Sequence, residues 1–267
     1  MKNINTSISI VTLSFNQGEY LDQCTESILK QLGDNDEYII VDPGSNDNSS
    51  EVISAIRSKI ILVNEKDSGP PQGLNNGFKM ASNKYYYFLN ADDILMPGAI
   101  KNMKLAISLN SNIDVLCFSG FFTDSALNII SPMRCFNFSA KRFCLGLTSV
   151  FQQGCLFKSD IFNEVGGFNE KNHTCWDAEL LLDMSLQGAT FLDINKDVAM
   201  FRLHDNSITG SNNNYLENNK TKDRLFYKTF LREATYASRT LPKVFKYIKY
   251  INYPSFTMKK VFFWLIK

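Results

Sequence analysis

Three absences in the 267-residue sequence narrow the classes of protein to which it can belong. No run approaches the roughly 18 apolar residues that a transmembrane helix needs. The first residues lack the apolar core and the small-residue cleavage site of a secretory signal peptide. The six cysteines include no Cys-x-x-Cys pair, so neither a zinc site nor a disulfide framework is indicated. We therefore expect a cytoplasmic protein with reduced thiols.

Negative charge is absent from the C-terminal end. All 27 acidic residues lie at or before Glu233, whereas seven of the 28 Lys and Arg residues follow it. Residues 243–267 interleave lysines with aromatic and aliphatic residues, and Pro254 divides them into two short pieces. This pattern suits a basic helical segment lying on an anionic membrane surface. The alternative is a helical pair that packs on the rest of the protein with its lysines in water. Nucleic-acid binding is disfavoured, because the aromatic side chains are expected to be buried and not exposed for stacking on bases.

The first half of the sequence alternates predicted strands with predicted helices. Strands are expected at 8–14, 37–41, 60–63 and 85–89, and helices at 18–32, 49–57 and 74–81. This order is typical of an α/β fold with a Rossmann-like, mostly parallel central sheet flanked by helices. The second half is less regular, with strands predicted at 113–122, 154–157, 191–194 and 199–203, helices at 160–165, 177–187 and 215–237, and a mobile loop at 211–219.

A polar cluster follows the apolar run 85–89. Asn90, Ala91, Asp92 and Asp93 place one amide and two carboxylates at the carboxyl end of a predicted strand, where open α/β sheets bind their ligands. Adjacent carboxylates repel each other, and hard oxygen ligands suit Mg²⁺ or Mn²⁺. The alternative is a solvated turn with Asp93 capping the next helix. These residues alone do not decide between a metal site and such a turn.

Several segments, in order, resemble the family 2 glycosyltransferases, which have the GT-A fold. The segments are residues 9–31, 38–53, 65–78 and 88–93 in the first half, and 151–170, 176–182 and 201–207 in the second. The resemblance covers roughly residues 6–210. It implies transfer of a sugar from a nucleotide-sugar donor, usually with inversion at the anomeric carbon. Bacterial enzymes of this type commonly build surface polysaccharides on glycan or lipid-linked acceptors.

The resemblance implies a donor site formed by residues that follow the predicted strands. Phe15 would lie against the nucleobase, unless it is a core aromatic. Asp42 would bind the base or ribose, although Asp before Pro-Gly-Ser is also good turn chemistry. Lys66 and Asp67 match positions that line the nucleotide site, with a surface ion pair as the alternative. Asn90 stands at the first position of the Asp-x-Asp motif and would contact the ribose.

The resemblance also implies a divalent metal, Mn²⁺ or Mg²⁺, held by Asp92 and His204. His204 matches a position that supplies a late metal ligand, although a lone histidine is often structural. Gln72 departs from the family pattern, in which Asp is common at that position, so no donor preference follows from this loop.

Asp177 is predicted to be the general base. It begins a helix, whose N-terminal dipole favours the anionic carboxylate that a base requires; its alternative role is an ordinary N-cap. Gln153, Trp176 and Glu179 are predicted on the acceptor side. Trp176 would pack against a sugar ring unless it belongs to the core, and Glu179 should point to a different face from Asp177.

We therefore predict an inverting glycosyltransferase with a catalytic domain at residues 1–212 and a helical, basic extension at 213–267. Within the domain, residues 1–98 would bind the nucleotide-sugar and 99–212 the acceptor. A catalytically silent nucleotide-sugar-binding or scaffold protein is the alternative. A dehydrogenase is disfavoured, because no Gly-x-Gly-x-x-Gly follows the first predicted strand. The expected location is the cytoplasm, and contact of the basic segment with anionic lipid would place the protein peripherally on the inner face of the cell membrane.

Overall fold

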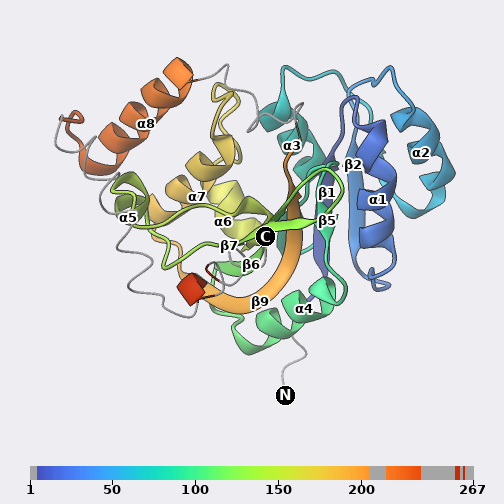
Figure 1. Cartoon of the computed structure of the whole chain (residues 1–267), viewed down its shortest axis with the longest axis horizontal. Coiled ribbons are helices and arrows are strands. Elements are labelled where there is room, and N and C mark those ends of the chain that lie inside the picture. The colour runs from blue at the N-terminus through green and yellow to red at the C-terminus, as the bar shows by residue number, and fades with distance from the viewer. Residues whose placement is uncertain (1–4, 205–214, 236–255, 259–260, 262–267) are drawn as a thin grey trace.

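The structure is a computed structural model, and it describes residues 5–204, 215–235, 256–258 and 261. Within these residues, nine strands form one sheet in the order β3-β2-β1-β4-β8-β6-β9-β5, with β7 paired to β6 (Figure 1). Most of the basic segment 243–267 lies outside the described residues. The predicted contact of this segment with an anionic membrane therefore stays a prediction.

The first half forms the alternating pattern that the sequence predicts. Its elements are β1 (Ile8–Leu13), α1 (Gly18–Leu29), β2 (Glu37–Val41), α2 (Ser49–Ala55), η1 (Arg57–Lys59), β3 (Ile61–Val63), α3 (Pro70–Lys79) and β4 (Tyr85–Phe88). The strand pairs β1–β2, β1–β4 and β2–β3 are all parallel. The helix predicted at 74–81 begins four residues earlier, at Pro70. Proline suits the first turn of a helix, because the N–H that it lacks has no partner there.

The second half adds β5 (Ile94–Leu95), α4 (Ala99–Leu109), β6 (Val115–Thr123), β7 (Ile129–Arg134), α5 (Ala140–Cys144), η2 (Gln152–Gly154), β8 (Cys155–Lys158), α6 (Ser159–Glu164), α7 (Trp176–Leu186), β9 (Phe191–Arg202) and α8 (Tyr215–Phe230). The strand β8 runs antiparallel to both β4 and β6, whereas β9 runs parallel to β6.

Two predictions for the second half were wrong. The strands predicted at 191–194 and 199–203 are one strand, β9, whose register against β6 shifts around Ser119. The shift accommodates the polar residues 195–197, so that one strand continues through them. The helix predicted at 215–237 is confirmed from Tyr215 and ends earlier, at Phe230, so residues 215–219 are not a mobile loop; residues 211–214 lie outside the described part of the chain.

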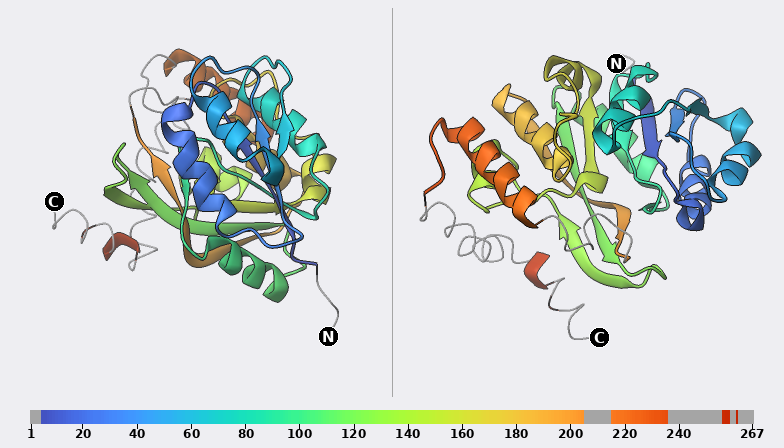
Figure 2. Two further views of the ribbon diagram at one scale, coloured as in Figure 1. Left: turned by 90° about the vertical axis from the view of Figure 1, so that its right-hand side faces the viewer. Right: turned by 90° about the horizontal axis from the view of Figure 1, so that it is seen from above.

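Side chains from the sheet pack into two hydrophobic clusters, one on each face. Along β1 and β4, Ile8, Ile10, Tyr85 and Tyr87 join the cluster that includes residues of α1, α2 and α4. Residues at the intervening positions, Val11, Tyr86 and Phe88, point to the other face and join the cluster that includes residues of α3, α6 and α7. Helices therefore cover both faces, as the two views in Figure 2 show. This arrangement explains why the central strands read as continuous apolar runs.

The helix α8 packs against the predicted catalytic domain, residues 1–212. Leu225 of α8 is buried in a cluster with Ala140 of α5 and Leu182 of α7. Farther along the chain, the ring of Phe256 packs edge-on against Phe136, with ring centroids 4.7 Å apart. This contact favours packing over membrane contact at Phe256 itself. No helix among the described residues is long and apolar enough to cross a membrane.

Gly120 of β6 lies so close to β9 that no larger residue fits. A Cβ atom at this position would lie 2.1 Å from the backbone oxygen of Ala199. We expect Gly120→Ala to lower the free energy of unfolding by about 1–3 kcal/mol or more, because the backbone must move. The neighbouring Ser119→Ala is the matched control. The buried Oγ of Ser119 has no hydrogen-bond partner among the described residues, so its removal should be neutral or stabilising. Urea unfolding of both variants tests the expected contrast, and equal midpoints would contradict it.

Candidate active site

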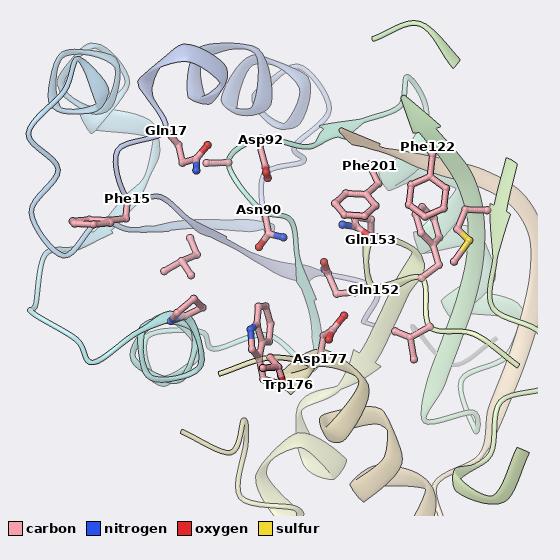
Figure 3. A pocket seen from close by; sticks show the side chains of 17 residues that line it. Phe15, Gln17, Asn90, Asp92, Phe122, Gln152, Gln153, Trp176, Asp177 and Phe201 are labelled. Atoms are coloured by element: carbon pink, nitrogen blue, oxygen red, sulfur yellow. The ribbon is translucent and has the colours of Figure 1, made fainter. Parts of the chain in front are cut away.

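The main pocket lies where the strand order reverses between β1 and β4. Open α/β sheets bind ligands in the crevice at such a point, at the carboxyl ends of the strands. The pocket has a volume of about 510 Å³ (Figure 3). Its lining residues are Leu13, Phe15, Gln17, Pro70, Asn90, Ala91, Asp92, Phe122, Met133, Val150, Phe151, Gln152, Gln153, Thr174, Trp176, Asp177 and Phe201. Six predicted site residues, Phe15, Asn90, Asp92, Gln153, Trp176 and Asp177, are therefore brought together.

One end of the pocket comes from the turns after β1 and β4. Phe15 is 53% exposed, so it is not the core aromatic that the sequence left as an alternative. The turn after β4 is tied to β1, because the backbone N–H of Ala91 donates to the carbonyl of Leu13 at 3.2 Å. This bond holds Asn90 and Asp92 at the pocket wall.

Asp92 and His204 lie together although 112 residues separate them. Asp92 Oδ2 lies 3.0 Å from His204 Nε2, and both side chains are largely buried. His204 follows the end of β9, and its ring lies against the ring of Tyr20 with centroids 4.8 Å apart. The structure thus places the two predicted metal ligands side by side.

Their donor set fits a divalent cation that takes its other ligands from a bound molecule. Among the described residues, no group of three or more His, Cys, Asp or Glu side chains could hold a metal by itself. Mg²⁺ and related ions are usually bound by one or two protein ligands together with phosphate oxygens and water. A carboxylate at the pocket wall with an imidazole beside it matches that pattern. The role of Asp92 and His204 as ligands stays a proposal.

Asp93 is buried and holds the pocket wall through hydrogen bonds, and it does not cap a helix. Its buried carboxylate accepts a hydrogen bond from Gln153 Nε2 at 2.8 Å and one from the backbone N–H of Arg202 at 3.0 Å. Burial raises the pKa of the Asp93 carboxyl well above its usual range, and the charge of Asp92 raises it further. The helix that follows, α4, begins after Gly98 instead. Asp93 therefore joins the turn after β4 to the end of β9 and fixes the amide of Gln153.

Asp177 lies in the first turn of α7, at the wall opposite Asp92 in Figure 3. The residue is half-buried, and it lines the pocket. Burial raises the pKa of the Asp177 carboxyl, while the backbone N–H groups of Asp177 and Ala178 act in the opposite direction. A carboxylate with a raised pKa that still reaches a pocket is suited to accept a proton.

Trp176 belongs both to the core and to the pocket wall. It is 7% exposed and packs against Phe88 and Phe168, with ring centroids 5.6 and 5.4 Å away. The face that remains open lies beside Asp177. Trp176 is therefore a core aromatic that also lines the pocket, and contact with a sugar ring stays a proposal.

Three predicted donor residues do not line this pocket. Asp42 is 3% exposed, and its carboxylate accepts hydrogen bonds from the backbone N–H and hydroxyl of Ser45 at 2.7 and 2.8 Å. This is the turn geometry that Asp-Pro-Gly-Ser also predicts. Lys66 is exposed, and Asp67 accepts a hydrogen bond from the backbone N–H of Gly69 at 2.9 Å. Any contact of these residues with a nucleotide stays a prediction.

Glu179 does not line the pocket, although the sequence predicts it on the acceptor side. The side chain is fully buried away from the pocket, where Arg224 of α8 lies 2.5 Å from Oε1. Hydrogen bonds from Arg224, Asn169 and Asn172 to this carboxylate hold its pKa below the usual range, against the effect of burial. The sequence indicates only that Glu179 points away from Asp177, because the residue that binds it lies 45 positions later.

The far end of the pocket was not predicted from the sequence. Gln152 lines it and donates to the carbonyl of Phe88 at 2.7 Å, and Phe122 and Phe201 face each other with ring centroids 5.2 Å apart. The polar doublet Gln152-Gln153 before the strand predicted at 154–157 is the one signal that could have indicated this wall. The ring pair could not be foreseen, because it depends on the pairing of β6 with β9.

Comparison with known proteins matches the family model "Glycosyl transferase family 2" over residues 9–166. The glycosyltransferase GlyG of Streptococcus pneumoniae serotype 4 is 37% identical over 100 residues, which are 36% of this chain and 33% of that protein. An uncharacterized glycosyltransferase of Rickettsia typhi is 24% identical over 219 residues, which are 79% of this chain and 68% of that protein. The chain thus spans only about a third of the length of the streptococcal relative.

Solved structures show the same fold at low sequence identity. The S. aureus TarS fragment 1–349 in complex with UDP-GlcNAc gives a TM-score of 0.70 at 16% identity, covering 94% of this chain and 73% of that one. The mannosyltransferase PcManGT of Pyrobaculum calidifontis, in complex with GDP-Man and Mn²⁺, gives 0.62 at 14% identity, covering 91% and 69%. These likenesses confirm the predicted GT-A fold. Because the family model covers more than half of the sequence, the chain belongs to glycosyl transferase family 2.

Proposed function

We propose that this protein is an inverting glycosyltransferase that moves a sugar from a nucleotide-sugar to a hydroxyl of a glycan or lipid-linked acceptor. The observation that carries the proposal is the position of Asp92 and Asp177 on opposite walls of one pocket (Figure 3). Inversion requires the base and the departing diphosphate on opposite sides of the anomeric carbon. Membership of glycosyl transferase family 2 supports the same reaction class.

The donor would lie along the turns after β1 and β4. Phe15 is exposed for stacking on the base, and Asn90 lies at the pocket wall beside Asp92 (Figure 3). A UDP-sugar is the preferred candidate, supported by the UDP-GlcNAc bound to the TarS fragment; the GDP-Man bound to the mannosyltransferase keeps GDP-sugars in the comparison.

The acceptor would enter beside Gln153, Trp176 and Asp177. One of its hydroxyl groups attacks the anomeric carbon as Asp177 takes the hydroxyl proton. A new carbon–oxygen bond forms, and the bond from the anomeric carbon to the diphosphate oxygen breaks. The electron pair of that bond leaves with the nucleoside diphosphate. Partial burial raises the pKa of the Asp177 carboxyl, which makes the carboxylate more basic than one in water.

Asp92 and His204 would hold a divalent cation, Mn²⁺ or Mg²⁺, whose charge stabilises the negative charge that builds on the diphosphate. Asp93 keeps the Asp92 turn and Gln153 in fixed positions through its two hydrogen bonds.

The proposal is tested by incubating the purified chain with UDP-, GDP- and dTDP-sugars and a panel of glycoside acceptors. We expect one donor to be consumed in Mn²⁺ or Mg²⁺ and spared in excess chelator. A catalytically silent binding protein would bind a donor without consuming it. Product configuration, read by NMR, should be inverted relative to the donor.

Phe15→Ala should weaken nucleotide binding and leave the fold intact. The ring is exposed and belongs to neither hydrophobic cluster, so its removal opens no cavity. Stacking of an aromatic ring on a base contributes about 1–3 kcal/mol, which predicts a rise in Kd of roughly 5- to 150-fold. Titration calorimetry with the nucleoside diphosphate measures this change. Leu109→Ala, on an exposed residue outside the pocket, is the control and should leave Kd unchanged. An unaltered Kd for Phe15→Ala would remove the ring from the donor site.

A further inference from the structure

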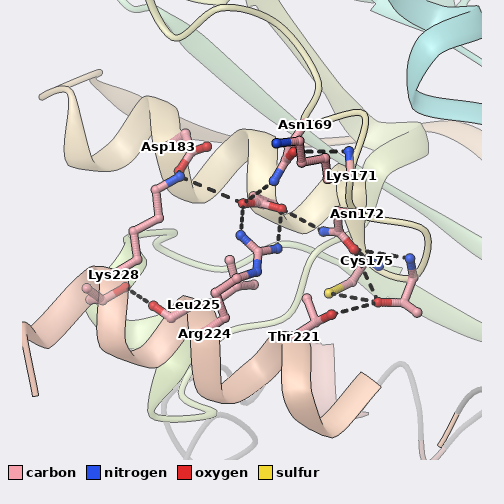
Figure 4. A network of polar contacts seen from close by, with 12 residues as sticks. Asn169, Lys171, Asn172, Cys175, Asp183, Thr221, Arg224, Leu225 and Lys228 are labelled. Carbon is pink, nitrogen blue, oxygen red and sulfur yellow. Dashed lines mark hydrogen bonds and ion pairs between the residues drawn. The ribbon is translucent and has the colours of Figure 1, made fainter. Parts of the chain in front are cut away.

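A polar network joins α8 to the segment that carries Asp177 (Figure 4). Its centre is the carboxylate of Glu179, which is 0% exposed. Arg224 of α8 binds this carboxylate through both terminal nitrogens, with Nη1 2.5 Å from Oε1 and Nη2 2.7 Å from Oε2. A planar guanidinium that pairs with two oxygens fixes the orientation of the carboxylate as well as its charge.

The other hydrogen bonds to Glu179 come from the loop that precedes α7. Asn169 donates to Oε1 at 3.0 Å, and Asn172 donates to Oε2 at 2.7 Å. Each carboxylate oxygen therefore accepts one hydrogen bond from the loop and one from α8. Asn172 in turn accepts a hydrogen bond from the backbone N–H of Thr174 at 3.1 Å. The network thus reaches from α8 to the loop residue at the edge of the pocket.

A second link runs between the hydroxyl groups of Thr174 and Thr221, which lie 3.2 Å apart. Thr174 lines the pocket together with Trp176 and Asp177. The loop is therefore held to α8 at two points, immediately before the predicted base.

The network also sets the rotation of the first turn of α7. Successive residues of an α-helix differ by about 100° around the axis, so Glu179 points about 200° away from Asp177. Fixing Glu179 against α8 on one side of the helix fixes the direction of Asp177 on the other. Among the described residues, the hydrogen bonds that lower the pKa of Asp177 come from backbone N–H groups and not from a comparable set of side chains.

We propose that Arg224 is a positioning residue for the base, acting through Glu179 and the loop 169–175. This inference rests on the proposed function, because it takes Asp177 as the base. It also makes α8 part of the catalytic unit, although α8 lies beyond residues 9–166 and within the predicted extension 213–267.

A merely stabilising role for Arg224 is the competing account. Arg224→Ala leaves the buried Glu179 carboxylate with Lys228 as its nearest cation, 3.7 Å from Oε1 and already paired with Asp183 at 2.5 Å. The double variant Glu179→Gln/Arg224→Ala separates the two accounts. It leaves no unpaired charge, so its Tm should return toward the wild-type value. A glutamine offers one acceptor oxygen where the carboxylate offered two, so one loop asparagine loses its partner.

We expect kcat to fall about 10- to 100-fold in both Arg224→Ala and the double variant, since small displacements of a catalytic group cost this much. The Kd of the nucleoside diphosphate should stay unchanged, because Phe15 and Asn90 lie in the turns after β1 and β4 and not in the loop 169–175. Arg224→Lys keeps the charge but loses the two-nitrogen geometry and should give an intermediate kcat. Lys222→Ala removes one positive charge from an exposed position of α8 and should match the wild type.

Fluorescence of Trp176 gives a readout that does not depend on activity. The chain has two tryptophans, so a Trp264→Phe background leaves Trp176 as the single reporter. Loosening of the loop should shift its emission to longer wavelength in Arg224→Ala and in the double variant, and not in Lys222→Ala. The inference is overturned if the double variant shows wild-type emission, or wild-type kcat at wild-type Tm. If the wild-type protein consumes no donor, the proposed function fails, and the emission data still decide whether Arg224 holds the loop.

Discussion

Asp177→Asn is expected to abolish most of the transfer activity and to leave donor binding nearly intact. The asparagine keeps the size of the side chain but cannot take the proton of the acceptor hydroxyl. General bases contribute roughly 10²- to 10⁴-fold to a rate, so kcat should fall by about that factor. Steady-state kinetics, with calorimetric titration of the nucleoside diphosphate, measures both quantities. Glu179→Gln is not a suitable control, because Glu179 supports the loop; Asp160→Asn, in the first turn of α6 and outside the pocket, should behave as wild type.

The same substitution should not lower stability. Burial raises the folded-state pKa of Asp177 above that of the unfolded chain, so its ionised form is disfavoured in the folded protein at neutral pH. Removing the charge removes this cost, and Tm of Asp177→Asn at pH 7 should equal or exceed the wild-type value. The wild type regains stability relative to the variant as pH falls from above the folded pKa to below the unfolded one.

The pH profile of the wild type follows from the same shift. Transfer requires the ionised Asp177 carboxylate, so activity is lost as pH falls through its raised pKa. The acid limb should therefore lie at higher pH than the value of about 3.9 typical of an exposed Asp. An acid limb at or below that value would argue against Asp177 as the base.

Asp92→Asn, and removal of divalent ions by a chelator, should each reduce transfer by roughly 100-fold or more. Asparagine lacks the charge that balances a cation, and the departing diphosphate then loses several kcal/mol of stabilisation. The two treatments should not be additive, because they remove the same interaction. Activity in excess chelator, with and without added Mn²⁺, tests this directly. Full activity of the wild type in chelator would show that transfer does not need a metal.

Much of the nucleotide half could be predicted from the sequence because its signals are local. The strand 37–41 was predicted at its observed bounds, and the cluster after β4 was placed at the sheet edge that forms the pocket wall. The pairing of Asp92 with His204 followed from family resemblance alone. No periodicity could have brought together two residues so far apart in the chain.

The predictions that failed concern partners from distant segments. Glu179 was expected near the acceptor, but Arg224 on α8 holds it on the opposite side of α7. The break at residues 195–197 suggested two strands, yet a register shift against β6 keeps β9 continuous. The apolar end of the pocket depends on the same β6–β9 pairing. Local sequence carries no signal for such contacts, because they are set by which strands and helices become neighbours.

The central claim is that Asp177 and the Asp92 turn act on one donor from opposite walls of the pocket. Release of nucleoside diphosphate in the presence of Mn²⁺, compared among wild type, Asp177→Asn and Asp92→Asn, tests it most directly. The account predicts metal-dependent release by the wild type from at least one of the UDP-, GDP- and dTDP-sugars, with both variants slowed by about 100-fold or more. Release by Asp177→Asn at the wild-type rate, or no release by the wild type from any of these donors with the acceptor panel present, would contradict it.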